Sequence, residues 1–391
     1  MRHILPLVLL LAGSASFAQG PASQSAPHPT YRVTILNSSG ASGNSIDDLG
    51  LASGSYTLPG NAQHASLWAF GRQIDLGTLG QGAGLSSTVQ WPVKNNLGII
   101  SGVSLTDALD PNQEGWACSF FLPNPNLNVC LGFVWDPADR RMRALPTLGG
   151  TNGFATGTNN LGETVGWAET AVHDPSCISP QVLQFLPVVW GPGRDAVHSL
   201  PLIGTDSSGA ATALNDRGQI VGISGACGIA VGGVSAAHAV IWENGIATEI
   251  KNPNGAPYWN TPMMINQHGV VVGFVGTPGD SAGDVTLAFI WTRKEGFAFL
   301  PLLQGDISST ATSVNERGQV VGYSNDAAGD LHAWIWQDGV TRNLNELVEP
   351  NADLTGPIGL AFDINDAGQI IGTTTSPQAI LHQAILVTPV W

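Results

Sequence analysis

The residues of this 391-residue sequence that could do chemistry are scattered carboxylates, histidines and cysteines. Asp363 is the candidate for a catalytic acid, because it lies two residues before Asn365 in a recurring motif, at a position where other copies carry uncharged residues such as Ala213 and Ser313. Cleavage of a glycosidic bond needs two facing carboxylic acids, and no partner for Asp363 is evident. The zinc-protease string H-E-x-x-H and the phosphate-binding string G-x-x-x-x-G-K-[ST] are also absent. The sequence therefore leans toward a protein that is not an enzyme.

Four aspartates are weak candidates for metal ligands. Asp280 and Asp284 lie in the string GDSAGD, and Asp326 and Asp330 lie in NDAAGD. Carboxylates clustered with glycine can hold calcium, but neither string follows a known calcium-loop pattern. We therefore interpret them as solvated turn residues, and the sequence implies no metal and no other cofactor.

An eight-residue motif is repeated along the chain and indicates the elements that position these side chains. NERGQVVG at 315 recurs closely at 215 and 365, and more loosely at 159 and 266. The glycine of N-x-x-G occurs seven times at intervals of 48 to 64 residues, and a second glycine always follows four residues later. The first glycines are Gly50, Gly98, Gly162, Gly218, Gly269, Gly318 and Gly368. Such a period is typical of propeller blades.

Each repeat predicts four short antiparallel strands. An Asn at the first position of a turn can bond its own backbone two residues on, and a Gly at the fourth position closes a hairpin. The second glycine lies inside a strand, where it predicts a close approach of two backbones. Strings such as HAVIW at 238 and HAWIW at 332 supply a third strand, and turns such as ENG and QDG precede a fourth.

The recurring tryptophans and histidines of the third strands are predicted to be structural. The tryptophans share one position of the repeat, where we expect them to fill the seam between blades. They are Trp68, Trp135, Trp190, Trp242, Trp291 and Trp336. For the histidines we expect structural hydrogen bonds, because metal ligands should converge on one site and not circle a ring.

The ends of the chain predict ring closure. The last repeat lacks its fourth strand, whereas YRVTIL at 31 aligns with that position. We predict an all-β, seven-bladed β-propeller of four-stranded antiparallel blades, in which residues 31–36 complete the last blade. A ring closed in this way leaves few free sheet edges.

The strings GQVVG at 318 and GQIVG at 218, each followed by an HA-x-x-W string, resemble the HAF-repeat family of secreted bacterial proteins. The resemblance covers about seven copies, although IDDLGLASG and GIISG in the first two copies depart from the pattern. It implies an exported repeat protein of the β-propeller kind, and it implies no enzymatic activity or ligand.

The start of the sequence predicts export. A basic residue, an apolar run from Ile4 to Leu11 and small residues around Ala18 are typical of a secretory signal peptide at 1–18. We expect a flexible segment at 19–30, a single propeller domain at 31–391, and a secreted or periplasmic location. No other segment is long and apolar enough to predict a membrane span.

The charge balance excludes some partners. The chain has 14 basic and 29 acidic residues, and removal of 1–18 would leave 13 minus 29, or −16. Such a chain is repelled by phosphate backbones, so we expect no nucleic-acid partner. The sequence gives no indication of an oligomeric state.

Loop lengths predict that the two faces of the ring differ. The hairpin turns of all repeats are short and share one face, which we call the turn face. The connections between second and third strands share the other face, which we call the variable face. Long connections of this kind run at about 103–130, 168–186, 224–238 and 274–286. Varied loops on a rigid scaffold usually carry binding, so we expect the binding site on the variable face.

Three tryptophans are the candidates for ligand contacts. Trp91, Trp116 and Trp259 lie outside the recurring position, and Trp116 and Trp259 are predicted on the variable face. Exposed there, they would stack on sugar rings or cap a hydrophobic partner. The competing interpretation, which we favour, is that they cover the base of the loops.

The four cysteines all map to the long connections and are predicted to form disulfides. Cys118 and Cys130 lie within one connection and are expected to pair, while Cys177 and Cys227 lie in neighbouring repeats and could link them. Sequence alone permits three pairings, and an even number of cysteines fits an exported chain.

Together these features predict an exported, non-catalytic propeller that binds a carbohydrate or an extracellular protein. One alternative is a glycan-active hydrolase or lyase with its site at the mouth of the channel. Another is a purely structural extracellular repeat protein.

Overall fold

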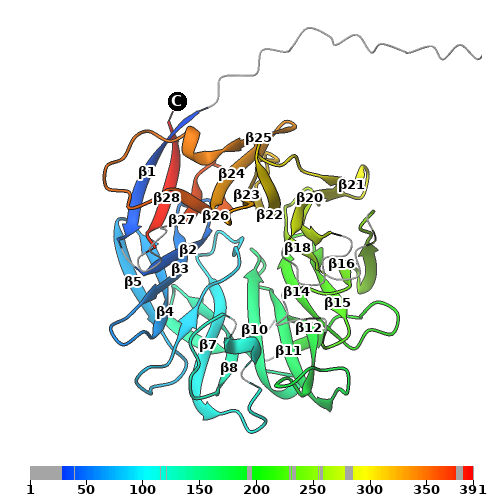
Figure 1. Ribbon diagram of the computed structural model, residues 1–391. Helices are drawn as coiled ribbons and strands as arrows, with labels where there is room; N and C mark the ends of the chain where they lie inside the picture. Colours follow the sequence, from blue (N-terminus) through cyan, green and yellow to red (C-terminus); the bar gives the residue numbers. More distant parts are fainter. Residues whose placement is uncertain are drawn as a thin grey trace, which may run out of the picture.

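A computed structural model describes residues 29–390 except 39, 115, 120, 192–195, 229, 231–234, 254, 256–258, 278–284 and 376–381. These residues form seven four-stranded antiparallel sheets arranged as blades around a central channel (Figure 1). The chain is therefore a seven-bladed β-propeller, as the repeat predicts. The predicted signal peptide and most of the segment 19–30 lie outside the described residues.

The blades follow the chain in order, and each runs from an inner to an outer strand. Blade 1 comprises β2 (Ala41–Ile46), β3 (Ala52–Thr57), β4 (Gln63–Ala69) and β5 (Arg72–Gly77). Blade 2 comprises β6 (Ser87–Thr88), β7 (Ile100–Leu109), β8 (Asn128–Asp136) and β9 (Arg141–Ala144). Blade 3 comprises β10 (Gly149–Thr158), β11 (Thr164–His173), β12 (Leu183–Trp190) and β13 (Val197–Ser199).

The second half of the ring has the same plan. Blade 4 comprises β14 (Ser208–Leu214), β15 (Ile220–Gly225), β16 (His238–Glu243) and β17 (Ile246–Ile250). Blade 5 comprises β18 (Asn260–Ile265), β19 (Val271–Gly276), β20 (Thr286–Thr292) and β21 (Gly296–Phe299). Blade 6 comprises β22 (Asp306–Val314), β23 (Val320–Asp326), β24 (Leu331–Gln337) and β25 (Val340–Asn343). Blade 7 comprises β26 (Ile358–Ile364), β27 (Ile370–Thr374), β28 (Ala384–Val390) and β1 (Thr30–Asn37).

Helical structure is minor in the part of the chain that the structure describes. It consists of the four-residue helix α1 (Trp116–Ser119) and the 3-10 turn η2 (Leu344–Glu346). A four-residue helix is far too short to cross a bilayer, so no described helix could serve as a membrane span.

The N-terminal strand closes the ring. β1 pairs antiparallel with β28, from Thr30 opposite Val390 to Asn37 opposite Ala384. The backbone of Tyr31 also bonds to Leu347 and Glu349 in the link from blade 6. The prediction that residues 31–36 complete the last blade is confirmed.

The second glycine of the motif allows the two innermost strands of a blade to pack closely. A Cβ atom on any of these glycines would lie only 1.9–2.2 Å from a carbonyl oxygen of the first strand of the same blade. The seven are Gly54, Gly102, Gly166, Gly222, Gly273, Gly322 and Gly372. The predicted close approach of backbones is therefore the reason for these glycines.

Beside these glycines, a bulge in the first strand ties neighbouring blades together. In blade 3 the register shifts between Ala155 and Gly157, and the hydroxyl of Thr156 donates to the backbone oxygen of Ala211 in blade 4 at 3.0 Å. Thr212 and Thr312 make the same bond to the next blade, at 2.5 and 2.8 Å. The inner strands are therefore linked by hydrogen bonds as well as by apolar packing.

The recurring tryptophans fill the seams, as predicted. Four of them, Trp68, Trp135, Trp190 and Trp242, are at most 4% exposed. Trp190 and Trp242 also donate through Nε1 to a backbone oxygen of Pro146 and Pro201. Trp291 and Trp336 are partly buried against the core of blades 5 and 6.

The glycine packing predicts a position-specific loss of stability. Gly166→Ala would place a methyl group 1.9 Å from the oxygen of Phe154, so we expect the free energy of unfolding to fall by roughly 2–3 kcal/mol. Gly157→Ala, in the neighbouring strand, is the control, because its methyl group would make only ordinary contacts, with Leu214 at 3.5 Å and the backbone oxygen of Pro92 at 3.8 Å. Urea unfolding measures both variants. Equal effects of the two substitutions would contradict this explanation.

Candidate functional site

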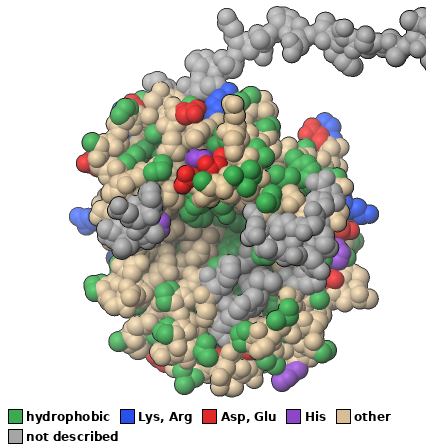
Figure 2. Space-filling model, viewed as in Figure 1, with side chains coloured by type: hydrophobic (Ala, Val, Ile, Leu, Met, Phe, Trp, Pro, Cys, Tyr) green, Lys and Arg blue, Asp and Glu red, His purple; other side chains and the backbone are tan. Residues whose placement is uncertain are grey.

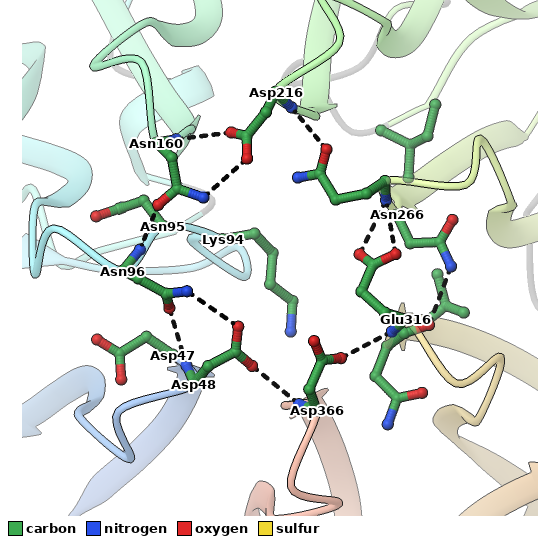
Figure 3. A pocket seen from close by; sticks show the side chains of 14 residues that line it. Asp47, Asp48, Lys94, Asn95, Asn96, Asn160, Asp216, Asn266, Glu316 and Asp366 are labelled. Atoms are coloured by element: carbon green, nitrogen blue, oxygen red, sulfur yellow. Dashed lines mark hydrogen bonds between the residues drawn. The ribbon is translucent and has the colours of Figure 1, made fainter.

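The N-x-x-G turns form a ring around one mouth of the channel. Figures 1 and 3 view this ring from opposite faces, because the blades run counterclockwise in the first and clockwise in the second. In each turn the first residue caps its own backbone: the Oδ1 atom of Asn315 accepts from the N–H groups of Arg317 and Gln319 at 3.1 and 3.0 Å. This is the bond that the turn chemistry predicts.

The same Asn side chains also join neighbouring blades. In blades 3 to 7 the Nδ2 atom donates to the backbone oxygen of the first turn residue in the next blade, at 2.9–3.3 Å. The donors are Asn159, Asn215, Asn266, Asn315 and Asn365, and the last bond reaches the oxygen of Asp47 across the point of closure.

The second residue of each turn completes a closed ring of seven hydrogen bonds (Figure 3). Its backbone N–H donates to the side-chain oxygen of the corresponding residue in the next blade, and the seven bonds measure 2.7–3.3 Å. In blade order the residues are Asp48, Asn96, Asn160, Asp216, Gln267, Glu316 and Asp366. We call this set the acceptor ring.

The acceptor ring surrounds a polar cavity of about 240 Å³. Asp48, Asp216, Glu316 and Asp366 bring four carboxylates to this mouth, and Asp47 adds a fifth at its wall. Lys94 is the basic residue among the lining residues. The turn end of the channel is therefore strongly acidic.

Lys94 offsets part of this negative charge, because its ammonium acts on the carboxylate of Glu316, but another carboxylate also pairs with it directly. Its ammonium lies 2.5 Å from Oδ1 of Asp363 and donates to the backbone oxygen of Ile364 at 2.6 Å. Asp363 also accepts from the N–H of Ile46 at 2.8 Å and from the hydroxyl of Ser313 at 2.6 Å. One carboxylate thus links blade 7, where the chain ends meet, to blades 1, 2 and 6.

These contacts change the interpretation of Asp363. Its side chain is 0% exposed and each of its oxygens accepts a hydrogen bond. A general acid must reach the atom to which it transfers a proton, whereas Asp363 is enclosed by the framework between blades. The structure gives it a structural role in place of the catalytic role considered from the sequence.

The pKa values at the mouth respond to burial and to like charge. Burial raises the pKa of Glu316, and repulsion by Asp366 raises it further, while the bond from the Gln267 N–H opposes the shift. Burial likewise raises the pKa of Asp47, although bonds from the N–H groups of Leu51 and Leu49 oppose it. Glu316 and Asp47 therefore lose their negative charge above the pH at which ordinary carboxylates do so.

The variable face is hollowed at its centre around the channel (Figure 2), but its described long connections are tied down. Cys118 bonds to Cys130, and Cys177 bonds to Cys227, which links blades 3 and 4. Both predicted pairings are confirmed. Asp174 lies close to Cys177 and Cys227, and this is the one cluster of three possible metal ligands within the described residues. Two of its three members form the disulfide.

A buried acidic cluster holds the two longest connections together. Glu114 accepts from the N–H of Val182 at 2.7 Å, and Glu169 accepts from the N–H of Asn152 at 2.8 Å. The Nε2 atom of Gln181 donates to both carboxylates, at 3.3 and 3.0 Å. Burial raises the pKa of Glu169, and the charge of Glu114 raises it further. This cluster is a clamp between loops and not an open surface.

The three candidate tryptophans differ in their surroundings. Trp91 is 5% exposed and packs edge-to-face on Phe121 and Phe154, at centroid distances of 5.4 and 5.6 Å. Aromatic rings of two other segments cover it, which agrees with the interpretation favoured from the sequence and not with a ligand contact. Trp259 is partly exposed, with a left-handed φ of 62°, and its ligand contact stays a prediction. Trp116 begins α1, and its side chain lies outside the described residues.

The other candidates are local turn residues or lie outside the described residues. Asp280 and Asp284 fall in the segment 278–284. The Oδ1 atom of Asp326 accepts from the N–H of Ala328 and Asp330, at 2.8 and 3.1 Å, so this carboxylate caps its own turn. His238 and His332 bond to Asp206 and Asp306, at 2.8 and 2.9 Å, which confirms the predicted structural role of these histidines.

Sequence reasoning missed the acceptor ring because the short turns seemed uniform. The signal was present, however: all seven second positions carry a side chain with a carbonyl or carboxylate oxygen. Such a regularity in an exposed turn residue indicates a shared hydrogen bond. The binding surface is therefore to be sought on the turn face as well as on the variable face.

Comparisons with known proteins agree with the fold. No protein-family model and no curated protein matches the sequence. Among solved structures, a catalytically inactive virginiamycin B lyase from Staphylococcus aureus with quinupristin is 9% identical at a TM-score of 0.51, over 92% of this chain and 100% of that one. The selenomethionine-substituted lyase is 10% identical at 0.52, over 92% and 100%. The propeller domain of the Trilobed protease from Pyrococcus furiosus is 10% identical at 0.48, over 92% and 95%. At such identities only the fold is shared.

The Lys94–Asp363 pair predicts a large coupling energy. Asp363→Asn removes the carboxylate that contacts the partly buried ammonium of Lys94, and we expect a loss of about 3 kcal/mol in the free energy of unfolding. A double-mutant cycle with Lys94→Met should give a coupling of at least about 1 kcal/mol. The exposed Arg32–Glu349 pair, at 3.2 Å, is the control and should give about 0.5 kcal/mol or less. Similar couplings for both pairs would contradict the assignment.

The raised pKa of Glu169 predicts how stability depends on pH. Folding disfavours the ionised carboxylate, so the free energy of unfolding should decrease as pH rises above 4.5 through the folded-state pKa. Glu169→Gln removes this pH dependence. We expect the free energy of unfolding of the variant, relative to that of the wild type, to be roughly 1 kcal/mol higher at pH 8 than at pH 4. Chemical unfolding at both pH values measures the gain. The exposed Glu295→Gln should show no such gain, and a gain in neither variant would refute the mechanism.

Proposed function

We propose that this protein is an exported, non-catalytic β-propeller that binds a positively charged group of a protein partner at the acidic turn end of its channel. The observation that carries the proposal is the set of four carboxylates that the acceptor ring fixes around a 240 Å³ cavity. Lys94, the basic residue of the lining, is paired with Asp363, so the carboxylates leave the lining of the mouth with a net negative charge. A cation entering the mouth would meet acceptors that are already in place, which lowers the entropic cost of binding.

The spacing of the carboxylates favours an organic cation over a single metal ion. Within the described residues, the acids of the mouth include no three whose oxygens lie within 4.8 Å of one another. A lysine or arginine side chain, with three or five donors, can bond to several separated acceptors at once. The opposite face is the competing location, where Trp259 could contact a carbohydrate.

Two further features support parts of this proposal. Two disulfides fit an oxidising compartment, and the sequence strings of the HAF-repeat kind are typical of exported proteins. Asp363 lends no support to a hydrolase or lyase, since its carboxylate is enclosed.

Replacing three mouth carboxylates by amides tests the proposal. The variant Asp216→Asn/Glu316→Gln/Asp366→Asn keeps the side-chain oxygens of the acceptor ring, in which Asn and Gln already occur at other blades. We expect penta-lysine to bind the wild type and to bind this variant at least about 10-fold more weakly. Glu295→Gln/Asp330→Asn/Asp353→Asn, with the same charge change at exposed sites, is the control. Calorimetric titration at low salt measures all three proteins.

Acidification provides a second arm of this test. Protonation of Glu316 removes a charge from the mouth, so affinity for penta-lysine should fall as pH decreases through the raised pKa of Glu316. Equal binding by the mouth variant and the control variant would overturn the proposal. Binding of neutral glycans that depends on Trp259 would favour the opposite face.

A further inference from the structure

The third residue of the N-x-x-G turn divides the turn face into two halves. Blades 1, 2 and 3 carry Leu49, Leu97 and Leu161, whose side chains are 65%, 48% and 65% exposed. Blades 4, 5 and 6 carry Arg217, His268 and Arg317 at the same position, and blade 7 carries Ala367. Three exposed leucines on consecutive blades therefore border one side of the acidic mouth, and basic residues border the other.

The leucines are not needed for the turn itself. The turn forms equally with Arg, His or Ala at this position in the other four blades, and its hydrogen bonds come from the first residue and from the backbone. Single exposed leucines are normal on protein surfaces. Three exposed leucines in adjacent blades around one cavity, in contrast, form apolar surface that the fold does not need.

Phe70 is a further exposed apolar residue on the turn face, and it is held there at a conformational cost. It is 95% exposed and has a left-handed φ of 51° in the outer hairpin turn of blade 1, between β4 and β5. The corresponding residues of blades 4 and 6 are Asn244 and Asp338, which have the same φ of 51°. Asn and Asp suit this conformation, whereas a bulky residue is strained there. Strain at an exposed aromatic residue points to a function outside the fold.

We propose that the partner is a polypeptide segment whose lysine or arginine enters the acidic mouth and whose neighbouring apolar side chains cover Leu49, Phe70, Leu97 and Leu161. This inference rests on the proposed function and specifies its ligand. Charge complementarity selects the cationic residue, and the basic half of the ring, with Arg217 and Arg317, directs the rest of the segment toward blades 1 to 3. A small amine would leave the apolar surface uncovered, and an anionic lipid surface would be repelled by the mouth.

The geometry of a blade sets the spacing of the recognised residues. Adjacent strands lie about 4.8 Å apart, so the outer turn lies about 10 Å beyond the inner turn. An extended chain spans about 3.3 Å per residue, so this distance corresponds to about three residues. The apolar residues of the partner should therefore lie within about three positions of its lysine or arginine.

A peptide scan against the wild type and one protein variant tests the proposal. The variant carries residues that other blades of the chain already have at the equivalent positions. The probes are nonapeptides with one central lysine in a Gly-Ser background, to which Leu or Phe is added at each position in turn. The variant is Leu49→Ala/Leu97→Ala/Leu161→Ala/Phe70→Asn, since Ala367 and Asn244 occupy the matching sites. Its thermal unfolding should occur at or above the wild-type temperature, which separates binding from stability.

We expect Leu or Phe within three positions of the lysine to strengthen binding to the wild type at least 10-fold over the lysine-only peptide. The four-residue variant should lose this gain and keep the lysine-only affinity. If apolar residues add nothing in the wild type, the inference is wrong while the proposed function stands. If no lysine peptide binds, the proposed function fails as well. Leucine-dependent binding of phosphatidylcholine vesicles without peptide binding would assign the surface to lipid and overturn the inference.

Discussion

The structure depends on one interaction, the hydrogen bond from the second turn residue of each blade to the side-chain oxygen of the next. Seven such bonds run head to tail and close at the pair formed by Asp366 and Asp48. Because every bond needs an acceptor from the following blade, the ring is complete only when blade 7 lies beside blade 1. The pairing of β1 with β28 and the buried contacts of Asp363 secure this same junction.

This interaction also shows that the negative charge at the mouth is not needed to form the ring. An amide oxygen serves as acceptor as well as a carboxylate does, as Asn96, Asn160 and Gln267 demonstrate. The four acidic residues are therefore not required by the hydrogen bonds. Keeping Glu316 charged carries a cost, because burial raises its pKa and repulsion by Asp366 raises it further, and the proposed cationic ligand would offset that cost when bound.

Much of the fold could be predicted from the sequence because the repeat constrains it sevenfold. The in-phase glycines, the Asn caps and the tryptophan seam each follow from local backbone geometry or from packing repeated in every blade. The disulfides agree with the placement of Cys118 and Cys130 within one connection and of Cys177 and Cys227 in neighbouring ones. The partners that bury Trp91 could not be predicted, because long-range contacts bring Phe121 and Phe154 against it. The acceptor ring was missed for a similar reason: short turns become a surface only when seven of them meet around one channel.

Amide hydrogen exchange at the second residue of each turn shows whether the acceptor ring closes. These N–H groups lie at an exposed turn, yet we expect all seven to exchange as slowly as amides inside the inner strands, because each is bonded to the next blade. Protection that is strong at Asn160 and Asp216 but absent at Asp366 and Asp48 would show that the ring does not close. Exchange at the free-peptide rate in all seven would show that the blades are not joined in this way.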